Sequence, residues 1–150
     1  MKTVTKITVA TTLVWLSAGS TAFATDQHAE HTADHRIAIS VDADAKEHLL
    51  LEMRQLLETV HAVLDSALKK DMKAVATHAE AVGLKAMRAT PANIANQLPK
   101  EFKMMGRGVH EAMDNIARDA KDMGDTQHTI EQVSTMLGSC VSCHATFKLK

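Results

Sequence analysis

The sequence predicts an all-α fold, and more specifically an antiparallel four-helix bundle. Three observations predict this fold class. Four stretches repeat apolar residues at alternating intervals of three and four, which is the spacing of an amphipathic helix. Two short turns and one longer connector separate the stretches, and no stretch carries the alternating pattern of a strand. Four amphipathic helices joined in this way favour a bundle with antiparallel neighbours.

The first 24 of the 150 residues have the features of a secretory signal peptide. Lys2 and Lys6 form a basic start, residues 7–16 are apolar, and Ala22-Phe23-Ala24 is a small-x-small cleavage site. The apolar run is too short to span a bilayer, although an uncleaved anchor is an alternative. We therefore expect a periplasmic protein without stable membrane insertion after cleavage.

Cleavage after Ala24 would remove two lysines and no acidic residue, so the formal charge would go from −1 to about −3. A mildly acidic chain gives no reason to expect nucleic acid or anionic lipid as a partner. Cleavage also removes Trp15, which leaves Phe102 and Phe147 as the only aromatic residues. The core must then be built from aliphatic residues and Met, or be completed by another flat apolar group.

Residues 25–43 form a polar arm that precedes the bundle domain, residues 44–150. The arm carries His28, His31 and His35, whose spacing would suit a transition metal if the segment were helical. A solvated tail is the favoured interpretation. We expect the arm to be disordered or loosely docked.

The first predicted helix runs from about Asp44 to Leu68, with Asp42 or Asp44 as its cap. Its apolar stripe consists of Leu49, Met53, Leu56, Val60, Val63 and Ala67, flanked by Leu50, Leu57 and Leu64. Lys69-Lys70-Asp71 interrupts the pattern, and Asp71 can cap a second helix that continues to about Met87. Gly83 lies inside this second helix and lowers its stability.

Thr90-Pro91 ends the second helix, because the residue before a proline is disfavoured in a helix. A connector over residues 91–98, with one turn at most, leads to Pro99 at the start of the third helix. The stripe of this helix consists of Phe102, Met105, Val109, Met113, Ile116, Ala120 and Met123. Gly106 and Gly108 interrupt it, either for close approach of a cofactor or helix, or for a local packing reason.

The fourth predicted helix follows Gly124, with Asp125 or Thr126 as its cap, and ends in a motif that carries chemistry. Cys140-Val141-Ser142-Cys143-His144 is C-x-x-C-H, the attachment pattern of c-type haem. The two thiols bond to the porphyrin vinyl groups and the imidazole binds iron. On a helix, positions i, i+3 and i+4 share one face. Ile130, Val133, Leu137, Cys140 and His144 step by three and four, so we expect the haem to lie inside the helical core.

Two other interpretations of the cysteines are weaker. A redox disulfide of the thioredoxin type needs a strand before the motif and a helix after it, and no strand is predicted. A zinc site needs about four ligands, whereas the motif supplies three. A haem-free helical metal-binding or stress protein is a further alternative.

A signal peptide, four helices and C-x-x-C-H near the end of the last helix resemble the class II c-type cytochromes, the cytochrome c prime family. Phe147 and Lys148 are similar to the aromatic and basic residues that follow the axial histidine in this family, and Arg54-Gln55 resembles a pair in its first helix. The resemblance implies one covalent haem c with His144 as the axial ligand. It further implies haem contacts from Lys148 and Arg54, and a homodimer.

The resemblance leaves the sixth iron position open, because the residue four after Arg54 is Glu58, an improbable ligand. Met53 on the core stripe is the candidate ligand; the alternatives are an open site shielded by Leu56 and Leu57, and ligation by another residue such as His48 or His61. His110 is expected to be partly exposed and unliganded, with a haem-edge contact as the alternative.

Two functions follow from these observations. The first is a periplasmic carrier of single electrons that exchanges them with redox partner proteins. It is not an enzyme, since no arrangement of catalytic residues is evident. The second is a five-coordinate haem protein that binds a small gas such as NO or CO at an open site. Met53 as an iron ligand favours the first function, and an open site favours the second.

Overall fold

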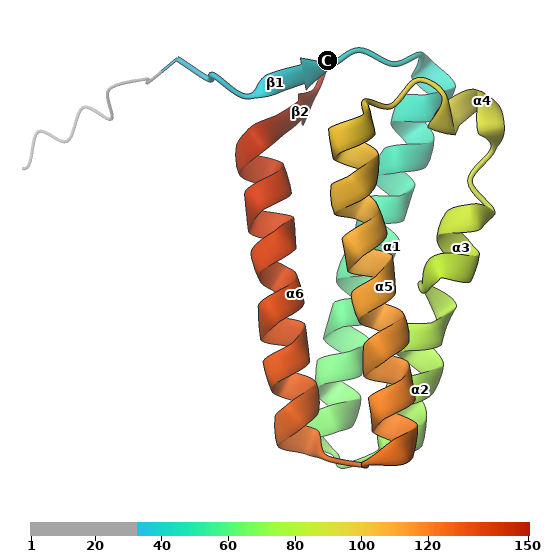
Figure 1. Cartoon of the computed structure of the whole chain (residues 1–150), viewed down its shortest axis with the longest axis vertical. Helices are drawn as coiled ribbons and strands as arrows, with labels where there is room; N and C mark the ends of the chain where they lie inside the picture. The colour runs from blue at the N-terminus through green and yellow to red at the C-terminus, as the bar shows by residue number, and fades with distance from the viewer. Residues whose placement is uncertain (1–32) are drawn as a thin grey trace, which may run out of the picture. The chain divides into compact units, whose positions relative to one another are not determined.

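The fold was analysed in a computed structural model that describes residues 33–150. The predicted signal peptide, and His28 and His31 of the arm, lie outside the described residues. Residues Asp34–Lys150 form one compact unit. Most of this unit is helical, which confirms the all-α prediction, and two short strands are present at its ends (Figure 1). None of the described helices is long and apolar enough to cross a membrane.

The helices and strands follow one another in a simple order. The elements are β1 (Ile37–Ile39), α1 (Ala43–Leu68), α2 (Met72–Ala81), α3 (Leu84–Arg88), α4 (Ala92–Ala95), α5 (Lys100–Asp122), α6 (Thr126–Thr146) and β2 (Phe147–Leu149). Three of the helices, α1, α2 and α6, begin as predicted, because aspartates cap them. Asp42 accepts a hydrogen bond from the Ala45 N–H at the start of α1. Asp71 and Asp125 each accept a hydrogen bond from a backbone N–H in the first turn of their own helices, α2 and α6.

The predicted second helix is divided at Val82 and Gly83, so the prediction of one helix to Met87 was wrong. The cause is a carboxylate from another helix. Asp114 of α5 accepts a hydrogen bond from the Leu84 N–H at 3.0 Å and so satisfies the first turn of α3. A Cβ atom at position 83 would lie 1.8 Å from Asp114 Oδ1. A side chain at position 83 would therefore displace the Asp114 carboxylate from the Leu84 N–H.

The two strands were not predicted. They pair in parallel, with Ile37 opposite Phe147 and Ile39 opposite Leu149, so the two ends of the compact unit lie side by side (Figure 1). The Lys150 N–H extends the pairing with a hydrogen bond to the Ile39 carbonyl at 3.0 Å. The last part of the predicted arm is consequently ordered. Strands of three residues are too short to produce a recognisable alternation in sequence.

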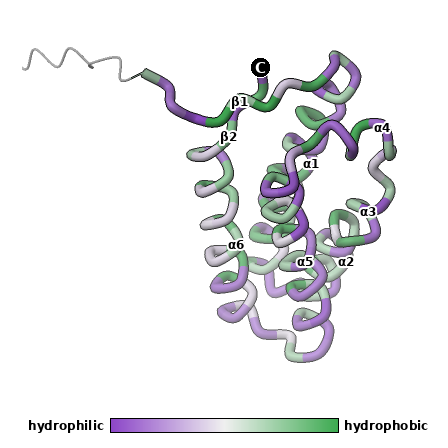
Figure 2. Tube along the Cα trace, turned by 45° about the horizontal axis from the view of Figure 1, so that its top comes forward, coloured by the Kyte–Doolittle hydropathy of each residue, from purple (hydrophilic) through white to green (hydrophobic). Residues whose placement is uncertain are grey.

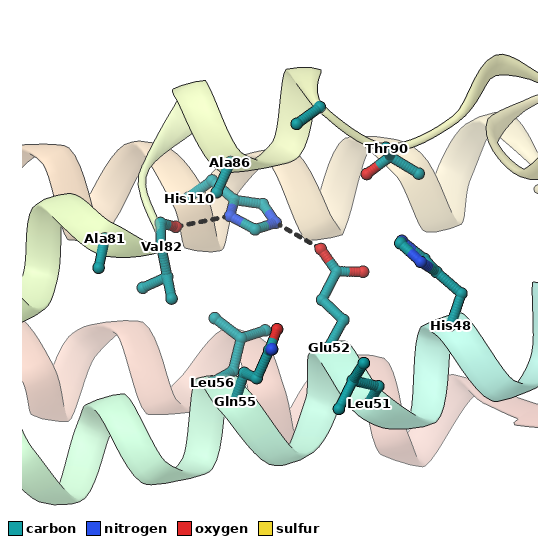
Figure 3. A pocket seen from close by; sticks show the side chains of 11 residues that line it. His48, Leu51, Glu52, Gln55, Leu56, Ala81, Val82, Ala86, Thr90 and His110 are labelled. Carbon is teal, nitrogen blue, oxygen red and sulfur yellow. Dashed lines mark hydrogen bonds and ion pairs between the residues drawn. The ribbon is translucent and has the colours of Figure 1, made fainter.

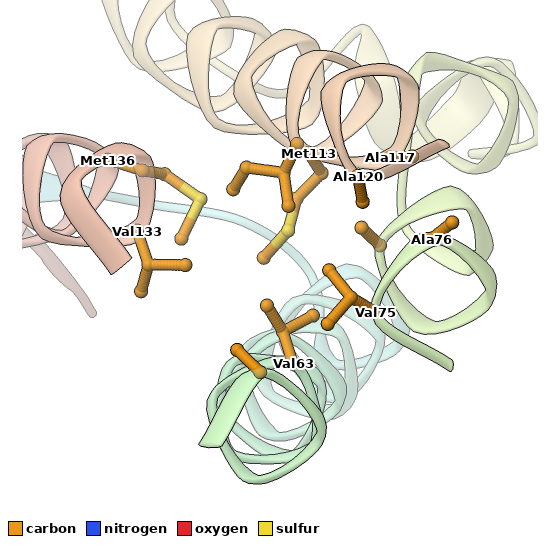
Figure 4. Close-up of a cluster of buried hydrophobic side chains, with 11 residues drawn as sticks. Val63, Val75, Ala76, Met113, Ala117, Ala120, Val133 and Met136 are labelled. Atoms are coloured by element: carbon orange, nitrogen blue, oxygen red, sulfur yellow. The ribbon is translucent and has the colours of Figure 1, made fainter. Parts of the chain in front are cut away.

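Four helices contact one another in a ring, α1 with α2, α2 with α5, α5 with α6 and α6 with α1. The contact between α1 and α6 is the least extensive of the four. Hydrophobic and hydrophilic residues alternate along the helices, as expected for helices that bury one face (Figure 2). The ring surrounds a hydrophobic core at the end where the short α1–α2 and α5–α6 turns lie (Figures 1 and 4).

The core contains only aliphatic residues and Met, as the sequence predicted. Its buried members are Val63, Ala67, Val75, Ala76, Ala79, Met113, Ile116, Ala117, Ala120, Val133 and Met136. All of them come from the second halves of α1 and α5, the first half of α6, and α2. The C-x-x-C-H motif lies at the opposite end of α6, beyond this core.

Candidate functional site

The C-x-x-C-H motif occupies the last two turns of α6. Cys140 and Cys143 are free thiols and both are half-buried. They follow Val133 and Met136 by seven residues each, which is close to two helical turns. Since Val133 and Met136 are buried, the two thiols continue the buried face of α6 toward the motif end of the molecule. The Cys140 thiol lies 3.8 Å from the Met136 carbonyl, as a weak hydrogen bond along the helix.

The predicted stripe of α6 was partly wrong. The buried positions are Thr129, Val133 and Met136, whereas Leu137 is 38% exposed. His144, seven residues after Leu137, is exposed as well. The core cluster ends at Met136 on α6, so later positions of the stripe lie beyond it, while Asp119 of α5 accepts a hydrogen bond from the Gln132 amide at 2.6 Å on another flank of the helix. The thiols are therefore half-buried beyond the core, and the imidazole is exposed.

The two thiols differ from a redox-active C-x-x-C pair in the direction of their pKa shifts. Burial raises the pKa of Cys140 and of Cys143, and the proximity of the Cys140 thiol adds to the effect at Cys143. The motif also lies at the C-terminal, negative end of a helix, which disfavours a thiolate. Reactive C-x-x-C cysteines have lowered pKa values and lie at helix N-termini. Among residues 33–150, no group of three or more His, Cys, Asp or Glu side chains is arranged to hold a metal ion.

Exposed apolar side chains surround His144 on α6. Leu137, Val141 and His144 are spaced by four and three residues and so share one face, on which Val141 is 70% exposed. Gln132 and His128 on the other flank of α6 bind Asp119 of α5. The face with His144 is thus directed away from the flank of α6 that binds α5.

A matching apolar face is present on α1. Leu50, Met53 and Leu57 are spaced by three and four residues; Met53 is partly buried, and the two leucines are 42% and 70% exposed. The opposite flank of α1 faces α2 and α3, since Glu52 and Leu56 line a cavity there. We refer to the two faces together, Leu50, Met53 and Leu57 on α1 and Leu137, Val141 and His144 on α6, as the α1–α6 seam. The candidate ligands Met53 and His144 belong to its two sides.

The remaining predicted site residues are placed differently. Arg54 and Glu58 are exposed on α1. Lys148 in β2 forms an ion pair with Asp34 at 3.3 Å. Its neighbour Phe147 is buried and packs edge-on against Phe102, with ring centroids 5.7 Å apart. The two aromatic residues of the compact unit thus meet at the motif end of the molecule.

His110 is a buried residue, so the prediction of partial exposure was wrong. It is 5% exposed, its Nδ1 lies 2.7 Å from the Val82 carbonyl oxygen and its Nε2 lies 3.4 Å from the Glu52 carboxylate (Figure 3). Burial disfavours the charged imidazole, but Glu52 and the Val82 carbonyl outweigh this effect and raise the pKa of His110. The position of His110 three residues before Met113 is a signal in the sequence that places it near the core.

The His110–Glu52 pair separates two cavities. The smaller, of 160 Å³, is lined by His48, Gln55 and Thr90 among others (Figure 3). The larger, of 310 Å³, lies among α1, the α3–α4 connection and the first half of α5, and includes Phe102 and Leu98. His48 therefore lies on the flank of α1 away from the seam. His61, the other alternative ligand, is exposed.

Comparison with family models, with curated proteins and with solved structures found no match.

Proposed function

We propose that the chain is a c-type cytochrome of class II type that carries single electrons in the periplasm. In this proposal Cys140 and Cys143 hold one haem c through thioether bonds, and His144 is the proximal iron ligand. The observation that carries the proposal is the arrangement at the end of α6. Two free, half-buried thiols continue the buried face of the helix, and the adjacent imidazole borders an exposed apolar seam.

The four helices of the ring are the members of an antiparallel bundle in this proposal. Its support is the order of contacts around the ring and the two short turns that join α1 to α2 and α5 to α6. The long connection through α3 and α4 joins the remaining pair.

The residues of the seam fit a porphyrin. A flat apolar group between α1 and α6 would cover the leucines and the valine that both helices expose there, and each would contribute roughly 1–2 kcal/mol on burial. The limited contact between α1 and α6 leaves this side of the ring the easiest to separate. The half-buried thiols lie on the same helix, on the face that continues its buried residues.

The haem would supply reversible one-electron chemistry at iron. The chain's own residues would anchor the haem and supply its iron ligands. The two thiols anchor the group, His144 binds from the α6 side, and Met53 is the candidate for the α1 side. A thioether at this position raises the reduction potential relative to an open site. Haem contacts from Arg54 and Lys148, the exchange of electrons with periplasmic redox proteins and a homodimer stay predictions.

The apolar character of the α1 face favours a second candidate function. Leu50 and Leu57 flank Met53, so the side of the haem that faces α1 would be apolar if Met53 did not bind iron. An apolar, open site would suit a small neutral gas such as NO or CO. The sixth ligand thus decides between carrier and gas-binding protein.

Spectroscopy of protein produced together with haem-attachment machinery tests the proposal. We expect a Soret band that survives extraction with acidified acetone, because the haem is covalent, and its loss in a Cys140→Ala, Cys143→Ala variant. A wild-type protein without a Soret band contradicts the proposed function.

The sixth ligand is tested with the same material. Ligation by Met53 predicts low-spin visible and electron-spin spectra that become high-spin in Met53→Ala. The matched control is Met104→Ala, which removes a thioether that is 62% exposed on α5. A high-spin wild type supports the gas-binding function and excludes the Met53-ligated carrier.

A further inference from the structure

The last turn of α6 leaves the carbonyl of His144 without its usual partner. In a continuing helix this carbonyl would accept from the N–H of Lys148. The helix ends at Thr146, and β2 carries Lys148 away in an extended conformation. The final hydrogen bond of the helix is that from the Phe147 N–H to the Cys143 carbonyl. The partner that replaces it for His144 is Arg36, whose Nη1 donates to the carbonyl at 3.3 Å.

Arg36 belongs to a short segment at the start of the compact unit, residues 34–39, which we call the N-terminal strap. Asp34 holds the guanidinium of Arg36 with two hydrogen bonds, at 3.0 Å from Nε and 2.8 Å from Nη2. Such a two-point contact fixes the direction of the guanidinium. Asp34 also accepts from the Arg36 backbone N–H at 3.1 Å. The remaining Nη1 is thereby aimed at α6.

The strap holds the other side of the motif as well. Lys148 donates to the Asp34 backbone carbonyl at 3.2 Å and pairs with its carboxylate. Ile39 of the strap is 2% exposed and anchors β1 against the molecule. The C-terminal end of α6 is therefore held at His144, at Lys148 and through the parallel strand pairing. Single exposed ion pairs contribute little, but here several contacts converge on one helix end.

We propose that Arg36 is a positioning residue for His144, and that the N-terminal strap fixes the last turn of α6 from which the imidazole binds iron. This inference rests on the proposed function. The physical reason is that helix ends fray, and a frayed last turn would leave the direction of the imidazole undefined. A hydrogen bond to the carbonyl of the same residue fixes the backbone that carries the ring. The strap comes from the other end of the compact unit, so the position of the ligand depends on the pairing of its two ends.

The test compares Arg36→Ala, Arg36→Lys and the matched control Arg107→Ala. Arg107 is also an exposed arginine in an ion pair, with Glu111 on α5, and its removal changes the net charge equally. The first measurement, amide hydrogen exchange, needs no haem. We expect exchange at the Phe147 and Lys150 amides to accelerate about fivefold in Arg36→Ala, the effect of losing one hydrogen bond. The control should leave it unchanged.

The second measurement is made on the haem-loaded protein at fixed pH and salt. Arg36→Ala should shift the midpoint potential and the ferric electron-spin spectrum by more than Arg107→Ala does. Arg36→Lys should restore part of the shift, because an ammonium can reach the carbonyl but cannot bind Asp34 at two points.

Three results would overturn the inference. Unchanged exchange in Arg36→Ala means that the strap does not hold the end of α6. Faster exchange with a potential and spectrum equal to those of the control means that its role is structural only. A wild type without a Soret band contradicts the proposed function itself and removes the ligand that Arg36 would position. The Soret band separates this last failure from the first two, and the exchange data, which need no haem, still show whether the strap holds the end of α6.

Discussion

Replacing Gly83 by alanine is expected to destabilise the protein for a reason that lies on another helix. A Cβ atom at this position would lie 1.8 Å from Oδ1 and 2.7 Å from Cγ of Asp114. The backbone of Gly83 has a φ of −72°, which alanine adopts without strain. The carboxylate of Asp114 must therefore turn away, and the Leu84 N–H loses its hydrogen-bond acceptor.

The magnitude follows from two opposing effects. Loss of a hydrogen bond to a charged acceptor destabilises by about 1.5–3 kcal/mol. Alanine restricts the unfolded chain and stabilises by about 0.4–1 kcal/mol. The free energy of unfolding should thus fall by about 1–2 kcal/mol. Gly108→Ala is the matched control, because nothing lies within 4 Å of a Cβ there and the residue is inside α5. This variant should be more stable by up to about 1 kcal/mol.

Urea unfolding followed by far-ultraviolet circular dichroism measures both variants. The two substitutions are chemically identical, and the double variant with Asp114 separates the effect of the carboxylate from that of helix position. A Gly83→Ala variant as stable as Gly108→Ala would refute the reasoning. The double variant Gly83→Ala, Asp114→Ala should lose no more stability than Asp114→Ala alone, apart from the small gain that alanine brings to the unfolded state.

Three further outcomes are expected. Met113→Ala, which truncates a fully buried side chain of the core, should lower the free energy of unfolding in urea by about 3 kcal/mol; a loss below 1 kcal/mol contradicts the described packing. The raised pKa of His110 stabilises the fold fully below about pH 6.5, and this contribution is lost as pH rises through the raised value. Stability measured from pH 6 to pH 9 should therefore fall more steeply in the wild type than in Glu52→Gln, and equal slopes would oppose the pairing. Arg36 holds the pKa of Asp34 well below its usual range. The Asp34 carboxylate should therefore titrate in NMR below about pH 3.9, and its pKa should rise toward that value in Arg36→Ala. Unchanged titration in the variant would contradict the contact.

Local signals in the sequence were sufficient for the starts of α1, α2 and α6. Asp42, Asp71 and Asp125 each act on an N–H two or three residues further along, so the whole interaction lies within a short stretch. The break at Gly83 was missed because its cause, Asp114, is 31 residues away in the sequence. A glycine alone does not reveal whether a carboxylate will approach it.

The register of α6 shows a second limit of sequence reasoning. Steps of three and four fit Leu137 and His144 as well as they fit Val133 and Cys140. Which of these positions is buried depends on where the neighbouring helices lie, as Val133 at 1% and Leu137 at 38% exposure show. The motif itself needs no such information, because its residues are local. The haem-attachment motif could therefore be recognised from the sequence, whereas the face of α6 that is buried could not be predicted.

The distribution of apolar residues gives the proposed cofactor a structural role. One end of the molecule is closed by an aliphatic core, whereas the α1–α6 seam exposes Leu57 and Val141, each at 70%. Exposed apolar faces of this kind are unfavourable in water unless something covers them. Thioether bonds would keep the porphyrin attached in the unfolded chain too. Its apolar surface would therefore be exposed before folding and buried on folding, like that of a side chain. Burying it in the seam would then stabilise the fold in the same way as burying the aromatic residues that this chain lacks.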